Sequence, residues 1–527
     1  MKARFIYQLI FAGASGILFF LSFPLPHGLS LGFVGWFCLF GLFFALENTS
    51  PKRAFLLGLV FGLLGFLGIL YWVPYSMIVY AGMSKVWAYL ALFLLALIMA
   101  GYYAIFALGY QQIKLFCEKH FFKFPYLALL VFACALWISL EYLRAYFPFG
   151  GFPWALLGLS QYKFLSLIQL AELGGVWMVS AVVFLGNFSL YALIRSRKKE
   201  RILLPVIFLL ILFLSAGFGK LRIKQIERLF ESTTKLQVGI VQPNIDQSIK
   251  WSPEFFWAEL EKQIQLTKSL GEKDLIIWPE ASITTYFNIY WQVVPRLKEK
   301  LSQFGCYLLF GSVSKESNGQ RINYYNSAFL LAPFGKKVLG RYDKIHLVPF
   351  GEYVPMQKIL FWVDAIAGGA TGNTTAGREF TIFDAGRFKI ACVICYELIF
   401  PSLVRKFVKQ GAELMSTITN DAWFGATSAP YQHFVNMVFR AVENRVYFLR
   451  SANTGISGVV DPCGKIITKS NIFTTETLQA EVRLKPNSLK TFYTKAGDWF
   501  CWLALFLTGF CFVIILAKEK FMPRSGK

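Results

Sequence analysis

Long apolar runs fill the first 220 residues of this chain and constrain its fold more than any other feature. Charged or Pro/Gly-rich loops separate the runs, and each run approaches the roughly 20 residues that a helix needs to cross a bilayer. Seven runs are centred on Ile17, Phe37, Leu63, Leu95, Ala133, Val183 and Leu210. We therefore expect a membrane domain at 1–220 with about seven transmembrane helices, and a C-terminal transmembrane helix at 497–518.

The chain carries a formal net charge of +23, which is typical of proteins that bind nucleic acid or an anionic membrane surface. In a chain with many apolar runs, basic residues collect in cytoplasmic loops and beside anionic headgroups. The sequence has no zinc-finger spacing and no basic region followed by a zipper. We therefore attribute the charge to the membrane and expect no nucleic-acid partner.

Basic residues occur in alternate loops between the apolar runs, which gives the chain an orientation. They include Lys52, Arg53, Lys114, Lys119, Arg195 and Lys199. Because basic loops stay in the cytoplasm, the long segment between the seventh and eighth runs is expected outside it.

That long segment, residues 235–487, has the pattern of an α/β domain. Short apolar runs alternate with amphipathic stretches, and such alternation favours a sheet covered by helices. We expect strands at 236–242, 275–278, 307–313, 328–332, 336–342, 388–395, 414–420, 448–451 and 458–461. We expect helices at 253–270, 293–304, 398–410 and 429–444.

Three polar residues follow apolar strands of this domain, at the strand ends where α/β proteins place their chemistry. Glu280 ends Leu275-Ile-Ile-Trp-Pro-Glu280, Lys344 follows the strand at 336–342, and Cys395 ends the strand at 388–395. A cysteine between a strand and a helix is expected to have a lowered thiol pKa, because the helix N-terminus favours the thiolate. Glu280 then serves as a general base and Lys344 stabilises a developing oxyanion.

These three residues, in Trp-Pro-Glu280, Tyr-Asp-Lys344 and Cys395-Tyr-Glu, resemble the Glu-Lys-Cys triad of the nitrilase (carbon–nitrogen hydrolase) superfamily. Together with the apolar runs, the chain resembles the apolipoprotein N-acyltransferase family over nearly its whole length. Val348–Pro355, Asn420–Gly425 and Arg450–Gly455 also match that family's pattern.

The resemblance implies a fold and a set of site residues. The fold is a multispan α-helical membrane domain with an extracytoplasmic nitrilase-like domain, an α-β-β-α sandwich. In the family's pattern Cys395 is the acylated nucleophile, Glu280 the general base and Lys344 the stabiliser of the tetrahedral intermediate. Accessory or substrate-binding roles fall to Glu352, Glu397, Tyr396, Trp251 and Asn326.

The resemblance also implies a reaction and a place in the cell. A fatty acyl group passes from a phospholipid, phosphatidylethanolamine in the family, to the cysteine as a thioester. It then passes to the α-amine of the S-diacylglyceryl-cysteine of an apolipoprotein. The setting is the bacterial inner membrane, with the catalytic domain in the periplasm, and neither a cofactor nor a metal is implied.

Two other functions compete with this interpretation. A membrane-tethered nitrilase-type amidohydrolase uses the same triad but lets water attack the acyl-enzyme, and a transporter or scaffold carries an inactive domain. A Cys-His protease is disfavoured, because His433 falls in a helical pattern and His346 belongs to the Lys344 loop. Asp421 either caps a turn or lines the pocket, and we favour the structural role. We interpret Cys392 as a core residue, since strand residues three apart face opposite sides.

Overall fold

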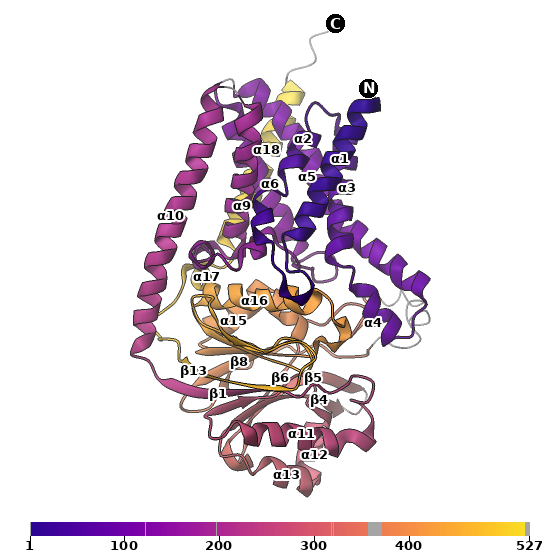
Figure 1. Cartoon of the computed structure of the whole chain (residues 1–527), viewed down its shortest axis with the longest axis vertical. Helices are drawn as coiled ribbons and strands as arrows, with labels where there is room; N and C mark the ends of the chain where they lie inside the picture. Colours follow the sequence, from indigo (N-terminus) through magenta and orange to yellow (C-terminus); the bar gives the residue numbers. More distant parts are fainter. Residues whose placement is uncertain are drawn as a thin grey trace. The chain divides into compact units, whose positions relative to one another are not determined.

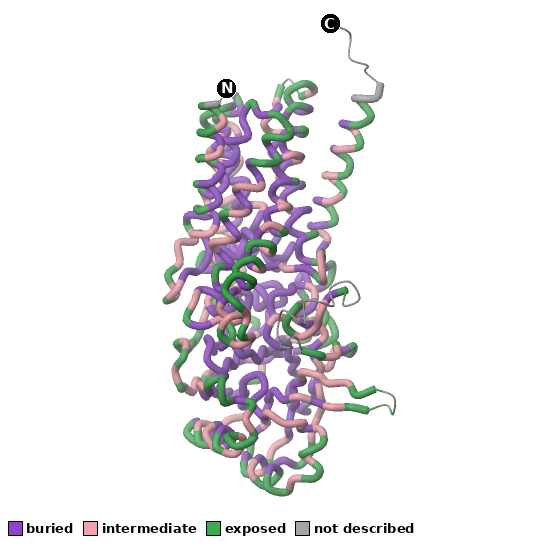
Figure 2. Tube along the Cα trace, turned by 90° about the vertical axis from the view of Figure 1, so that its right-hand side faces the viewer, coloured by how far each residue is buried: buried purple, intermediate pink, exposed green. Residues whose placement is uncertain are grey.

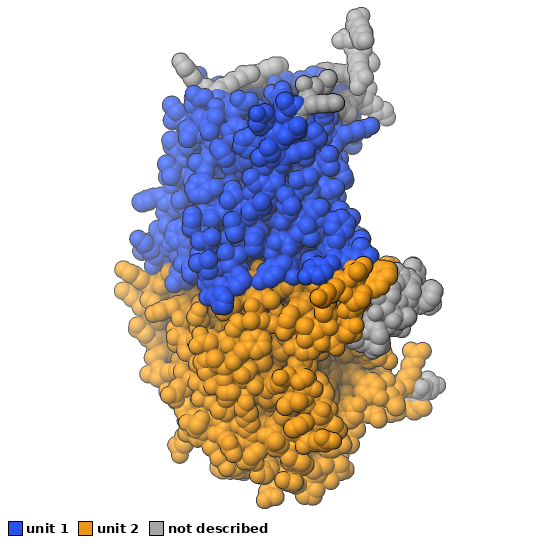
Figure 3. Space-filling view, turned by 45° about the vertical axis from the view of Figure 1, so that its right-hand side comes forward, with its two compact units in different colours: residues 1–71, 89–221, 496–527 blue, residues 72–88, 222–495 orange. Residues whose placement is uncertain are grey.

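The computed structural model describes residues 2–121, 123–196, 198–317, 319, 321–356 and 372–521. The chain divides into two compact units, coloured separately in Figure 3. Unit 1 comprises residues 1–71, 89–221 and 496–527, and unit 2 comprises residues 72–88 and 222–495. Unit 2 is therefore built from two separate stretches of the chain.

Unit 1 is helical. Its helices are α1 (Lys2–Leu21), α2 (Phe40–Ala45), α3 (Pro51–Ile69), α5 (Lys85–His120), α6 (Pro125–Arg144), α7 (Leu165–Ile168), α8 (Ala171–Gly174), α9 (Val176–Arg195), α10 (Lys198–Glu231) and α18 (Trp499–Phe521), with the first residues of α5 and the last turns of α10 in unit 2. Within the described residues, seven helices are long and apolar enough to cross a membrane: α1, α3, α5, α6, α9, α10 and α18. Large apolar side chains of α10 are exposed, among them Leu210 and Phe213, as expected of a face that meets lipid.

Glycines let the helices of unit 1 approach closely. A Cβ on Gly16 of α1 would lie 2.4 Å from the carbonyl oxygen of Phe61 in α3. A Cβ on Gly58 of α3 would lie 2.3 Å from the carbonyl oxygen of Tyr103 in α5. Small residues at such crossings are the usual means of close packing between membrane helices.

The apolar run around Phe37 differs from the expected long helix. It forms short 3₁₀ and α segments, η2 (Gly32–Trp36) and α2, in place of one span. Glycine weakens a helix, and a Cβ on Gly32 would lie 2.3 Å from the carbonyl oxygen of Ser160. Close packing of the segment against η3 (Leu157–Gln161) thus takes precedence over a continuous helix.

Unit 2 holds two sheets (Figure 1). The first has the order β13-β1-β2-β4-β5-β6 with β3 beside β4, and the second has the order β12-β11-β10-β9-β8-β7. The strands of the first are β1 (Lys235–Gln242), β2 (Leu275–Ile277), β3 (Ile283–Tyr286), β4 (Tyr307–Ser317), β5 (Ile322–Leu331), β6 (Val338–Asp343) and β13 (Glu476–Arg483). Those of the second are β7 (Phe383–Asp384), β8 (Lys389–Ile394), β9 (Leu414–Thr419), β10 (Tyr447–Ala452), β11 (Gly458–Val460) and β12 (Ile466–Lys469).

Helices cover the outer face of each sheet, so unit 2 has four layers (Figure 1). Helices α11 (Phe256–Ser269), α12 (Phe287–Val293) and α13 (Pro295–Leu301) lie on the first sheet. Helices α15 (Pro401–Lys409) and α16 (Ala429–Asn444) lie on the second. Figure 2, with buried residues in purple, shows burial concentrated inside the unit. The predicted α/β fold and the α-β-β-α sandwich are confirmed.

A segment from the N-terminal half of the chain completes unit 2. Helix α4 (Val73–Val79) packs on the 3₁₀ turn η7 (Asp421–Phe424). The ring centroids of Trp72 and Phe424 are 4.8 Å apart, and the hydroxyl of Tyr80 donates to the carbonyl oxygen of Ala422 at 3.2 Å. Residues 72–88 thus pack against the α/β unit, although they come from the N-terminal half of the sequence.

Candidate active site

The carboxylate of Glu280 is held just beyond the end of β2. Its Oε1 accepts a hydrogen bond from Asn326 Nδ2 at 2.7 Å, and its Oε2 accepts one from the backbone N–H of Asn420 at 2.8 Å. Gly311 in β4 makes room for this turn, because a Cβ there would lie 2.8 Å from Glu280 Cα. Burial raises the pKa of Glu280, although the Lys344 ammonium opposes the shift.

Lys344 follows β6 and is buried. Its Nζ lies 2.8 Å from Glu352 Oε2. Burial alone would lower the pKa of Lys344, but the carboxylates of Glu352 and Glu280 raise it above its usual value. The side chain is therefore a fixed ammonium inside the site.

Cys395 follows β8 and opens the short 3₁₀ turn η6 (Cys395–Ile399) with φ at +52°. Burial raises the pKa of its thiol and the Glu280 carboxylate adds to this, while Lys344 and a hydrogen bond from Thr419 oppose it. The expected lowering of the thiol pKa by a helix N-terminus is therefore wrong. Helix α15 begins only at Pro401, and loss of hydration outweighs the partial charges of the short turn.

Two further carboxylates, those of Glu397 and Glu352, hydrogen-bond separate segments of the site. Glu397 Oε1 accepts from the Tyr342 hydroxyl and from the N–H groups of Ile345 and His346, at 2.7, 2.8 and 2.9 Å. Its Oε2 accepts from the N–H of Ile394 at 2.7 Å. Glu397 thus joins the loop after Lys344 to the strand end before the cysteine.

Glu352, the partner of the Lys344 ammonium, also joins separate segments of the site. Its Oε2 accepts from the N–H of Val348 at 2.8 Å, and its Oε1 accepts from Asn326 Nδ2 at 3.2 Å. The Asn326 amide therefore bridges the Glu280 and Glu352 carboxylates.

The other two expected site residues, Tyr396 and Trp251, have no hydrogen bond to Glu280 or Lys344 among the described contacts. Tyr396 packs its ring near those of His346 and Phe400, with centroids 5.8 and 5.1 Å away. Trp251 is 49% exposed, and among the described contacts none joins it to Glu280, Lys344 or Cys395.

A second lysine of the site was missed by sequence reasoning. Lys250 is buried, and its Nζ donates to the backbone carbonyl of Glu280 at 3.0 Å. Burial lowers the pKa of Lys250 to about 8, against the opposing charges of Glu280 and Glu259. The signal was present in Gln247-Ser-Ile-Lys-Trp251, where only the tryptophan was singled out.

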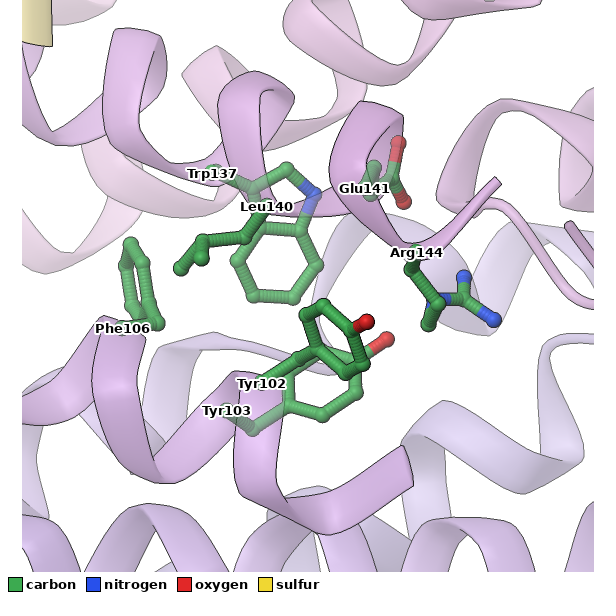
Figure 4. Close-up of a pocket in the computed structure, with 7 residues that line it drawn as sticks. All are labelled: Tyr102, Tyr103, Phe106, Trp137, Leu140, Glu141 and Arg144. Carbon is green, nitrogen blue, oxygen red and sulfur yellow. The ribbon is translucent and has the colours of Figure 1, made fainter. Parts of the chain in front are cut away.

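A small cavity of about 10 Å³ in unit 1 has no part in this cluster (Figure 4). It is lined by Tyr102, Tyr103, Phe106, Trp137, Leu140, Glu141 and Arg144. Because one water needs about 10–15 Å³, the cavity is too small for an acyl chain. Across the described residues, no group of three or more His, Cys, Asp or Glu side chains is arranged to hold a metal ion.

Comparison with known proteins assigns both parts of the chain. Residues 237–486 match the model of carbon-nitrogen hydrolases, and residues 15–189 match that of the apolipoprotein N-acyltransferase N-terminal domain. The apolipoprotein N-acyltransferase of Geobacter metallireducens is 38% identical over 503 residues, which cover 94% of this chain and 92% of the relative. The chain belongs to the apolipoprotein N-acyltransferase family.

Two further members of the family align along most of their length. The enzyme of Methylococcus capsulatus is 33% identical over 512 residues, covering 96% of this chain and 95% of its own. That of Rickettsia prowazekii is 32% identical over 444 residues, covering 84% of this chain and 86% of its own. Membership of the apolipoprotein N-acyltransferase family thus extends over both units of the chain.

Proposed function

We propose that this protein is an apolipoprotein N-acyltransferase of the bacterial inner membrane that works through an acyl-cysteine. One observation carries the proposal: in a chain related to this family along both units, Asn326 and Glu352 link the buried Glu280 and Lys344, and the buried Cys395 is close enough for both charges to act on its thiol. The site holds a thiol, a carboxylate and an ammonium, which suffice for acyl transfer through a thioester.

The first half-reaction forms the thioester. The Glu280 carboxylate takes the thiol proton as the Cys395 sulfur attacks the ester carbonyl carbon of a phospholipid. The carbonyl electron pair moves to the oxygen, and the Lys344 ammonium stabilises this oxyanion. Collapse breaks the ester C–O bond, and the leaving lysophospholipid oxygen takes the proton back from Glu280.

The second half-reaction forms the amide. The α-amine of an S-diacylglyceryl-cysteine attacks the thioester carbonyl, and Glu280 accepts a proton from the nitrogen. Collapse breaks the C–S bond, and the sulfur of Cys395 regains its proton from Glu280. The raised pKa of Glu280 suits it to this repeated acceptance and return of a proton.

The same triad serves an amidohydrolase, so the acceptor decides between the two functions. Purified protein is incubated with phospholipid carrying a labelled acyl chain and a diacylated lipopeptide. We expect labelled N-acyl peptide, and a labelled thioester on Cys395 when the peptide is omitted. Release of labelled fatty acid without peptide acylation would instead establish a hydrolase, and absence of both products would leave the domain inactive.

A matched pair of variants links the chemistry to one sulfur. Cys395→Ala is expected to abolish both the thioester and the product. Cys392→Ala, three residues earlier and buried in β8, is expected to keep both. Full activity in Cys395→Ala would overturn the mechanism.

We further propose that unit 2 lies on the periplasmic side and that the acyl donor is phosphatidylethanolamine. The alternate basic loops of the sequence support this orientation. Alkaline phosphatase fused after Asn487 is expected to be active, because that enzyme requires an oxidising compartment. Vesicles that differ only in headgroup test the donor, and equal rates with phosphatidylglycerol would refute the preference.

A further inference from the structure

The imidazole of His433 hydrogen-bonds the backbone of the proposed nucleophile. His433 lies on α16, fully buried, with Nε2 3.0 Å from the carbonyl oxygen of Cys395. Its Nδ1 lies 3.2 Å from Asp421 Oδ1 and 3.1 Å from Arg450 Nη2. Both ring nitrogens are thus engaged by groups other than the thiol, which removes His433 as the base of a Cys-His protease.

The partners fix the protonation of this ring. A carbonyl oxygen only accepts, so Nε2 carries the hydrogen in the bond to Cys395, whereas a guanidinium only donates, so the Nδ1 of a neutral ring accepts from Arg450 and does not donate to the neighbouring Asp421 carboxylate. Arg450 Nη2 directs its other N–H to Asp421 Oδ2 at 2.6 Å. Burial and the charge of Arg450 lower the pKa of His433, in agreement with a neutral imidazole.

The Asp421 carboxylate is held in place by several neighbouring groups. Burial alone would raise the pKa of Asp421, but the Arg450 guanidinium holds it below its usual value. Thr419 Oγ1 donates to Asp421 Oδ1 at 2.9 Å. A Cβ on Gly455 would lie 2.2 Å from Asp421 Oδ2, so the backbone packs directly on this carboxylate.

These residues converge because β8, β9 and β10 are parallel neighbours. Cys395 follows β8, Asp421 follows β9, and Arg450 lies in β10. Their side chains therefore meet at the end of the sheet where the nucleophile lies.

The held carbonyl belongs to a residue in an unfavourable conformation. Cys395 has φ at +52°, in the left-handed region that residues with a side chain rarely adopt. The peptide group is planar and trans, so anchoring the carbonyl oxygen of Cys395 also fixes the direction of the Tyr396 N–H. This hydrogen bond thus helps to fix the turn that presents the sulfur.

We infer that His433, held beside Asp421 and Arg450, is a positioning residue that keeps Cys395 in its left-handed turn for attack on the acyl donor. The inference rests on the proposed function, in which the sulfur of Cys395 accepts the acyl group. His433 acts through the backbone of Cys395 and exchanges no proton with the substrate.

Two conservative variants test the inference. The amide nitrogen of His433→Gln reaches the position of Nε2 and replaces the donor, whereas the amide of His433→Asn ends near Nδ1 and does not. We expect His433→Asn to slow thioester formation by about 10- to 100-fold with KM little changed, since one positioning hydrogen bond is lost. His433→Gln is expected to recover most of the rate.

A second measurement is the rate at which iodoacetamide alkylates the Cys395 thiol, determined across pH by mass spectrometry of the peptide that contains Cys395. This rate does not depend on acyl transfer. We expect His433→Asn to change this rate and His433→Gln to restore it. Asn436→Ala is the matched control, because Asn436 is buried one turn along α16 and bonds backbone carbonyls of its own helix.

The outcomes separate the two proposals. Wild-type rates in His433→Asn, or equal losses in both histidine variants with unchanged melting temperatures, would overturn the positioning role while the thioester on Cys395 still forms. Absence of any thioester in the unmodified protein would overturn the proposed function itself.

Discussion

Replacing Glu397 by glutamine exchanges one carboxylate oxygen for an NH₂ group, and we expect this change to destabilise the site. The carboxylate accepts four hydrogen bonds and is fully buried. The best placement of the amide keeps its oxygen toward Tyr342, Ile345 and His346, and turns its NH₂ toward the N–H of Ile394. One charge-assisted bond worth about 2 kcal/mol is lost, and a buried donor is left unsatisfied at about 1–2 kcal/mol. The three weakened bonds are offset by the smaller desolvation of a neutral group.

The expected loss is therefore about 3 kcal/mol, which corresponds to roughly 6–12 °C in the melting temperature of a domain of this size. Hydrogen exchange locates the effect, because the amides of Ile345, His346 and Ile394 should lose protection by about 100-fold. N-acylation, measured well below the melting transition, should fall with them. Glu254→Gln, at an exposed carboxylate, is the control. Unchanged melting, exchange and activity in Glu397→Gln would refute the view that this carboxylate joins the Lys344 loop to the cysteine strand.

Three further perturbations follow from the same geometry. Asn326→Ala removes a hydrogen bond that favours the ionised form of Glu280, so its pKa rises further and the acid limb of the pH–kcat profile should move to higher pH; an unmoved limb would exclude Glu280 as the titrating base. Lys250 has a pKa lowered to about 8 in the folded protein, so the unfolded chain binds one more proton between about pH 8 and 10.5. The free energy of unfolding therefore rises by up to about 1.4 kcal/mol per pH unit between about pH 8 and 10.5, and this gain is lost as the pH falls from 10.5 through 8. Lys250→Met should flatten the slope of melting temperature against pH across that range, and an unaltered slope would contradict the burial of the charge. Gly455→Ala places a Cβ 2.2 Å from Asp421 Oδ2 and should destabilise by about 1–3 kcal/mol in thermal melts, whereas Gly217→Ala, with open space around its Cβ, should not; equal melting of the two would contradict the packing on Asp421.

Sequence patterns predicted the elements whose burial is strong. Helix α16 spans the expected residues 429–444, and β1 and β9 each lie within one residue of expectation. Strand β13 was missed, because Glu-Thr-Leu-Gln-Ala-Glu-Val-Arg lacks a run of apolar residues and is an edge strand paired with β1. Its pairing is decided by hydrogen bonds to a distant strand, which local pattern does not reveal.

The residues of the candidate site could be predicted from the sequence more readily than their pKa shifts. Polar residues at strand ends singled out Glu280, Lys344 and Cys395, whose catalytic roles stay a prediction. The sign of the thiol pKa shift was not predictable, because it depends on burial that several distant segments supply together. Lys250 was missed in the sequence for the same reason, since only the fold places its ammonium against the Glu280 backbone.

The participation of residues 72–88 in the α/β unit has a practical consequence for anyone who wishes to study the chemistry without detergent. A fragment excised at Arg222 would look like a complete soluble enzyme by sequence, yet it would lack Trp72 and Tyr80. The rings of Phe424 and Trp423, against which those side chains pack, would then face water beside the turn that carries Asp421. Grafting the excluded stretch back onto such a fragment is therefore the minimum requirement for a water-soluble version of the catalytic half.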